Sequence, residues 1–157
     1  MGLKDSLRKG DNEGSSYVRR VLVATDRSPT AEQAEAWAAE MANRYGAELV
    51  LLQVVVPPAQ PSLAMTEELV RHAQSLAGER GKGAVVVGED PGKAIIEAAE
   101  TEDVDVVVVG NVGMSGRKEF LLGNVPNRVS HGVRRTVVIV NTAQLTEEKG
   151  RKRGFFR

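Results

Sequence analysis

The chain has 157 residues, no cysteine, and 21 basic residues that balance 21 acidic ones, so its formal net charge is zero. This length suits one domain with a single core, and the lack of cysteine excludes disulfides and thiolate metal sites and fits a reducing cytoplasm. Neither nucleic acid nor a membrane is an expected partner, because no net charge attracts a polyanion and no apolar run approaches the ~20 residues of a spanning helix.

A first strand and helix are predicted after a polar leader. Residues 1–17 lack hydrophobic periodicity, which is typical of a flexible segment. Val18 to Thr25 predicts a strand, and a capping-box pattern from Thr30 to Gln33 predicts the start of a helix that ends at Gly46. One face of this helix is expected to lie on the sheet, with Trp37 as a core anchor; its residues are Ala34, Trp37, Ala38, Met41 and Tyr45.

Strands and helices continue to alternate in the middle of the chain. Glu48 to Val56 predicts a second strand, and a helix is expected from about Leu63 to Ala77. Gly81 and Gly83 are expected to break the chain before a third strand, Ala84 to Val87. A third helix follows, with Asp90 as its cap and an inner face made of Ala94, Ile95, Ala98 and Ala99.

The stretch from Asp105 to Asn127 is the most informative about function. Val106 to Val109 is a continuous β-branched run, which indicates a strand buried on both faces. A glycine-rich loop follows, and then a short helix with Asn124 as its cap and Pro126 in its first turn. A strand, a glycine loop and a helix N-terminus together collect free backbone N–H groups, so this arrangement suits a phosphate.

The alternation of strands and helices predicts an α/β domain over residues 18–142, followed by a basic, flexible tail at 143–157. We expect a single doubly wound, five-stranded parallel sheet flanked by helices, which is a Rossmann-like architecture. In such sheets the ligand lies at the carboxyl ends of the strands, where the strand order reverses. Asp26 follows the first strand, and Gly110 ends the fourth.

The glycines of the loop carry a resemblance to a known family. They follow the spacing G-x2-G-x9-G at Gly110, Gly113 and Gly123, with Asn124 next and with Val109 and Val125 on the flanks. This pattern resembles the nucleotide-binding signature of the universal stress protein family, in its ATP-binding branch. The resemblance also covers residues 21–26 and 136–140, and so extends over about residues 18 to 142.

The resemblance implies the strand order 3-2-1-4-5 and an adenine nucleotide as ligand. Asp26 would contact the nucleoside, Val54 would contact adenine mainly through its backbone, and the three glycines and Asn124 would hold the phosphates. ATP, accompanied by Mg²⁺, is the implied ligand, with AMP and cyclic AMP as alternatives. The family usually has Ser or Thr where this chain has Asn124. Pro126 lacks an N–H that would otherwise point at the ligand, so we expect less preference for the triphosphate.

The resemblance implies a regulatory module of the stress response, and the residues give little support for catalysis. Ser115 does not lie in a nucleophile elbow, and His72 and His131 are on separate helices without metal-ligand spacing, so no catalytic or metal residue is assigned. Weak ATP hydrolysis or autophosphorylation stays open, as does a dimeric scaffold that binds no nucleotide. The apolar strand Thr136 to Val140 is expected at the sheet edge, which predicts a homodimer.

Overall fold

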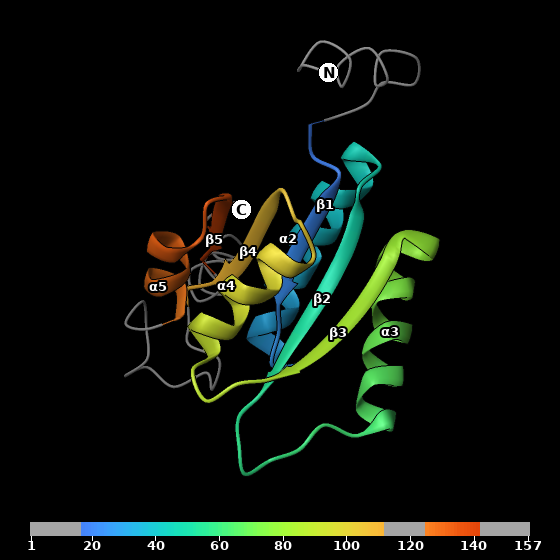
Figure 1. The fold of residues 1–157 in the computed structure, drawn as a ribbon. Coiled ribbons are helices and arrows are strands. Elements are labelled where there is room, and N and C mark those ends of the chain that lie inside the picture. The colour runs from blue at the N-terminus through green and yellow to red at the C-terminus, as the bar shows by residue number, and fades with distance from the viewer. Residues whose placement is uncertain (1–16, 112–124, 142–157) are drawn as a thin grey trace, which may run out of the picture.

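Five parallel strands form one sheet in the order β3-β2-β1-β4-β5 (Figure 1). The computed structural model describes residues 17–111 and 125–141. The strands are β1 (Arg20–Ala24), β2 (Glu48–Val55), β3 (Gly81–Val87), β4 (Val106–Gly110) and β5 (Thr136–Val140). The predicted fold class and strand order are therefore confirmed. The basic tail, and the leader apart from its last residue, lie outside the described residues.

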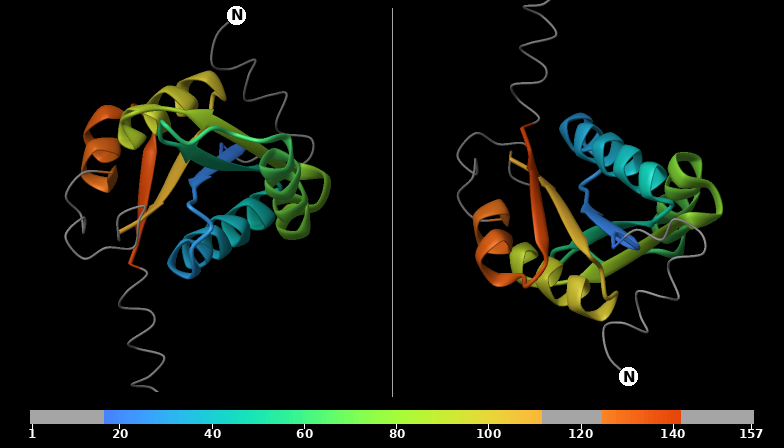
Figure 2. Two further views of the ribbon diagram at one scale, coloured as in Figure 1. Left: turned by 90° about the horizontal axis from the view of Figure 1, so that it is seen from below. Right: turned by 90° about the horizontal axis from the view of Figure 1, so that it is seen from above.

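Helices cover both faces of the sheet (Figure 2). The helices are α2 (Pro29–Tyr45), α3 (Leu63–Ala77), the short 3₁₀ turn η1 (Gly78–Arg80), α4 (Pro91–Thr101) and α5 (Val125–Gly132). Helices α2 and α3 pack on one face, and α4 and α5 pack on the other. None of these helices has the length and apolar character needed to cross a membrane.

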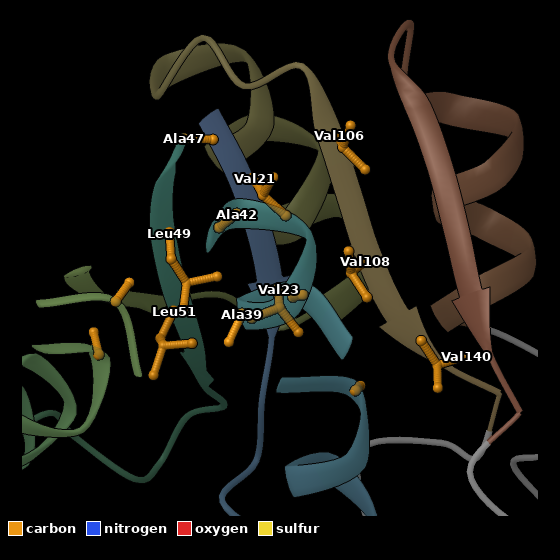
Figure 3. Close-up of a cluster of buried hydrophobic side chains, with 14 of the residues drawn as sticks. Val21, Val23, Ala39, Ala42, Ala47, Leu49, Leu51, Val106, Val108 and Val140 are labelled. Carbon is orange, nitrogen blue, oxygen red and sulfur yellow. The ribbon is translucent and has the colours of Figure 1, made fainter. Parts of the chain in front are cut away.

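The core lies on both faces of the three inner strands, β2, β1 and β4. Figure 3 shows the α2 side, where Val21 and Val23 of β1 lie between Leu49 and Leu51 of β2 and the valines of β4. All four residues from Val106 to Val109 are at most 4% exposed, as the β-branched run predicts. Full burial of each such side chain stabilises the fold by about 1.5–3 kcal/mol, so these strands form a rigid support for the turns at their carboxyl ends.

The predicted start and inner face of the first helix are partly wrong. Ser28 is the N-cap, because its hydroxyl accepts a hydrogen bond from Ala31 N at 3.2 Å, and Thr30 lies inside α2. Trp37 is only half-buried at the margin of the core, and Tyr45 is 49% exposed. The small side chains allow α2 to approach the sheet closely; the buried residues are Ala34, Glu35, Ala38, Ala39 and Ala42.

The third strand begins three residues earlier than predicted, because its glycines are required for packing and do not break the strand. A Cβ atom on Gly81 would lie 2.2 Å from the carbonyl oxygen of Ala73 in α3, and one on Gly83 would lie 2.9 Å from Val70 N. Only glycine permits this approach of strand and helix backbones. By contrast, the bounds of α3 and β5, and the cap and inner face of α4, agree with the predictions.

Candidate functional site

Two of the predicted site residues lie level with each other at the carboxyl ends of β1 and β2. Ala24 and Leu52 are Cα partners in the sheet, and Asp26 and Val54 each follow that pair by two residues. The backbone continues this pairing for one more step, since Thr25 N donates to Leu52 O at 2.8 Å. The register therefore brings Asp26 and Val54 to the same edge of the sheet, at the carboxyl ends of two adjacent strands.

Gly110 lies on the other side of β1, at the end of β4. Val23 and Val108 are Cα partners, so Gly110 and Asp26 follow the same pair by two and three residues. The sheet continues from β1 toward β2 and β3 in one direction and toward β4 and β5 in the other. The point between β1 and β4 is thus the place where the strand order reverses and where such folds bind ligands.

The turn that carries Asp26 is closed by hydrogen bonds to its own backbone. Asp26 Oδ1 accepts from Ser28 N at 3.0 Å, and Thr25 Oγ1 accepts from Arg27 N at 2.9 Å. Arg27 has a φ of 64°, in the left-handed region that residues other than glycine rarely adopt. Asp26 Oδ2 makes no hydrogen bond within the described part of the chain, and the carboxylate is half-buried. One oxygen of this carboxylate thus shapes the turn.

The three predicted valines lie on the α4 and α5 side of the sheet. Val54 and Val125 are half-buried at the margin of the core, and Val125 is the first residue of α5. Val109 is 2% exposed, with its side chain in the core. Any contact of Val109 with a ligand would therefore come from its backbone.

The start of the glycine loop is tied to β5. Asn111 N donates to Val140 O at 2.9 Å, and Asn111 Nδ2 donates to Asn141 Oδ1 at 3.0 Å. Gly110 is the Cα partner of Val140. The other predicted phosphate residues, Gly113, Gly123 and Asn124, lie outside the described residues.

A cavity of about 490 Å³ opens between the start of α4 and α5. Its cations are Lys93 and Arg128, but Arg128 Nη1 lies 2.8 Å from Asp90 Oδ2, and Glu89 and Glu97 also line the space. Three carboxylates thus line the cavity against two cations, so its charge does not by itself specify an anion. Across residues 17–111 and 125–141, no group of three His, Asp or Glu side chains is arranged to hold a metal ion.

The sequence interpretation missed a buried carboxylate beneath the Asp26 turn. Glu35 of α2 is 1% exposed and contacts Thr25 at the end of β1 and His72 of α3. A signal was present, because Glu35 precedes Ala38, Ala39 and Ala42 by three, four and seven residues, the spacing of one helix face. An acid in the middle of an alanine face indicates a buried, paired charge.

Comparison with known proteins identifies one family. The model of the universal stress protein family matches residues 18–141. A universal stress protein of Mycobacterium bovis is 32% identical over 132 residues, which cover 76% of this chain but only 44% of that protein. The chain thus spans less than half the length of that relative. Another, from Mycobacterium tuberculosis, is 30% identical over 146 residues, which cover 81% of this chain and 99% of the relative.

A solved structure extends the comparison to the fold and to a ligand. The crystal structure of a universal stress protein in complex with cAMP is 32% identical in sequence and superposes with a TM-score of 0.65. The match covers 81% of this chain and 99% of the solved chain.

Proposed function

The chain belongs to the universal stress protein family, and we propose that it binds an adenine nucleotide at the carboxyl ends of β1 and β4, as a regulatory module of the stress response. The observation that carries the proposal is the register that brings Asp26 level with Val54 and beside Gly110. The 32% identical relative solved with cAMP supports an adenine nucleotide as the ligand class. We propose that this protein acts in the cytoplasm.

Each site residue has a role that its chemistry allows. Asp26 Oδ2 accepts hydrogen bonds from the ribose hydroxyls, because a carboxylate facing the phosphates would repel them. Val54 contacts adenine through its backbone at the end of β2. The phosphates lie over Gly110, near the first turn of α5, where the helix dipole favours an anion. In this proposal Gly113, Gly123 and Asn124 complete the phosphate site, flanked by Val109 and Val125.

Pro126 bears on which nucleotide is preferred. It is the second residue of α5 and is buried, so the first helical turn lacks one backbone donor. A hydrogen bond to a charged group contributes roughly 1.5–3 kcal/mol, so one lost donor reduces phosphate affinity about tenfold or more. We propose that AMP or cyclic AMP competes well with ATP, whose binding would be accompanied by Mg²⁺.

The proposed function is tested by calorimetry with ATP, AMP and cyclic AMP at fixed salt and magnesium, after mass spectrometry of any nucleotide that co-purifies. We expect Asp26→Asn to weaken binding of the preferred nucleotide about tenfold. Asp103→Asn is the matched control, since Asp103 lies at the opposite end of the sheet and its side chain is 82% exposed. If none of the three nucleotides binds the wild type, the proposed function is wrong, and the alternative of a dimeric scaffold that binds no nucleotide is favoured.

We further propose that nucleotide binding shifts a partner equilibrium and that turnover, if any, is slow. The partner includes a second copy of the chain, paired through β5. Within residues 17–111 and 125–141 this strand is the last of the sheet, and Ile139 on it is 42% exposed, so its outer edge has no partner strand in that part of the chain. Light scattering should give a dimer mass at micromolar concentration, and a monomer mass throughout would contradict the pairing. A hydrolysis assay on the same sample tests turnover.

A further inference from the structure

Glu35 is a charged residue in a place where charges are rarely found. It lies on the inner face of α2, and its side chain is 2% exposed. A buried carboxylate is tolerated only when hydrogen bonds and opposite charges replace the water that it has lost. The identity of its partners therefore shows what this residue holds in place.

Three partners surround the carboxylate: two belong to the turn after β1, and one lies on α3. Thr25 Oγ1 donates to Glu35 Oε1, and His72 Nε2 of α3 lies 2.5 Å from Glu35 Oε2. Because an ionised carboxylate only accepts hydrogen bonds, the threonine hydroxyl and the imidazole nitrogen are the donors. The guanidinium of Arg27 is the third partner, with Nη1 3.6 Å from Oε1.

These contacts continue into the turn that carries Asp26. Thr25 Oγ1 donates to Glu35 and at the same time accepts from Arg27 N at 2.9 Å. Arg27 holds the left-handed φ of 64°, and its Nη1 atom is buried with no hydrogen-bond partner in the described residues, so the Glu35 charge is what compensates it. Glu35 thus acts on the residues immediately before and after Asp26.

We propose that Glu35 is a positioning residue for the nucleoside end of the site. It fixes Thr25 and Arg27, and through them it sets the direction of the Asp26 carboxylate. A backbone conformation as uncommon as that of Arg27 persists only where its surroundings over-determine it, and such conformations occur preferentially at ligand-binding turns. This inference rests on the proposed nucleotide site, and it assigns no contact between Glu35 and the ligand.

The contact with His72 links the same carboxylate to α3. Arg27 also borders a cavity of about 410 Å³ that is lined by Gln53, Met65 and Glu68 on β2 and α3. Glu35 therefore joins the Asp26 turn to a helix on the α2 side of the sheet, opposite the face of Val54. A change at His72 should therefore be felt at the Asp26 turn through Glu35.

The main test is Glu35→Gln in the full chain, with cyclic AMP as the probe. The amide keeps the shape and can still accept from Thr25, but it loses the charge that compensates Arg27. We expect binding to weaken by about fivefold or more. Glu40→Gln is the matched control, since it makes the same change on an exposed part of α2, where Glu40 pairs with Arg44 four residues on.

A double-mutant cycle separates positioning from general weakening. If Glu35 acts through Asp26, Glu35→Gln should have little further effect in an Asp26→Asn background, because that background already lacks the carboxylate. A full, additive loss in the double variant would overturn the inference. If Glu35→Gln does not fold, His72→Gln and His72→Leu decide the point. The His72→Gln variant can still donate a hydrogen bond to Glu35, so it should bind cyclic AMP nearly as well as the wild type. The His72→Leu variant cannot donate, so it should bind cyclic AMP more weakly. Equal binding by both would contradict us.

Amide chemical shifts test the inference without a ligand. We expect Glu35→Gln to shift the backbone amide signals of Arg27 and Ser28, whose N–H groups donate to Thr25 Oγ1 and Asp26 Oδ1, while Glu40→Gln leaves them in place. Unchanged signals in Glu35→Gln would overturn the positioning role. If the wild type binds no nucleotide, the proposed function fails, whereas the amide signals still decide whether Glu35 sets the turn.

Discussion

The two ends of the sheet both carry polar clusters, but they differ in how far water reaches them. At the amino end, Glu48 of β2 accepts from Arg20 at 3.1 Å and from Lys82 at 2.7 Å. Their side chains are 30–51% exposed. At the carboxyl end, Glu35 is 2% exposed, and its partner His72 is 25% exposed.

This difference in exposure indicates which cluster constrains the conformation of the residues around it. Exposed ion pairs contribute little to stability, because water and salt screen them and each side chain has other conformations available. A buried carboxylate must be satisfied in one arrangement, so it constrains every residue that it contacts. The amino end therefore tolerates change, whereas the carboxyl end holds the turn on which the proposed site depends.

The largest effect should come from removing the buried acid. Glu35→Ala leaves His72 and Arg27 without their partner, and we expect a loss of about 3 kcal/mol in the free energy of unfolding. This is the lower part of the range for breaking a buried pair, since 25% and 28% of those two side chains remain exposed. Urea denaturation measures it. Replacing Glu35 and His72 together by leucine should restore the part of the loss that comes from His72, since Arg27 stays without its partner, and no recovery would contradict the Glu35–His72 pairing.

The next effect tests whether the amino end depends on sterics more than on charge. Gly81 begins β3, and a Cβ atom there would meet the backbone of Ala73 at 2.2 Å. We expect Gly81→Ala to cost about 2 kcal/mol through overpacking. Gly46→Ala is the control, because Gly46 has open space around it but a φ of 64°, and it should cost about 1 kcal/mol. If the two variants lose the same free energy of unfolding, the backbone near Gly81 must move to make room for the added Cβ atom.

A smaller effect is expected from the exposed acid of the amino end. Glu48→Gln should lower the free energy of unfolding by about 0.5 kcal/mol, the usual size for a partly exposed ion pair. The difference from wild type should shrink in 1 M salt, where the Debye length is about 3 Å. A loss as large as that of Glu35→Ala would break the contrast between the two ends.

The smallest effect is the pH dependence that Glu48 contributes. The hydrogen bond from Lys82, assisted by Arg20, holds the pKa of Glu48 below its ordinary value of 4.5, although burial acts in the opposite direction. A lowered pKa in the folded state means that the unfolded chain binds more protons, so stability rises with pH in that window. The difference between wild type and Glu48→Gln should be complete above pH 4.5 and should shrink as the pH falls below it. A difference that grows on acidification would contradict this assignment.

Much of the fold was predictable because its determinants are local. The valine run from Val106 to Val109 indicated a strand buried on both faces, and the Asp90 cap and alanine spacing of α4 placed that helix and its inner face. Periodicity and capping depend on residues within one or two turns of each other. The glycine spacing around Gly110, together with Asp26, was sufficient to identify the family.

Other features depended on contacts between distant residues. The sequence suggested that Gly81 breaks a strand, whereas its role depends on the close packing of α3 against β3. Similarly, the cap of α2 is Ser28 because the turn after β1 places its hydroxyl near Ala31 N. The Glu35–His72 contact joins residues that are 37 positions apart, so no local pattern contains it. The elements and the family could thus be predicted from the sequence, because neighbours along the chain determine them. Helical spacing could also show that Glu35 is buried, but its partners beneath Asp26 depend on how α3 and the turn after β1 pack against α2, and so they became known from the folded structure.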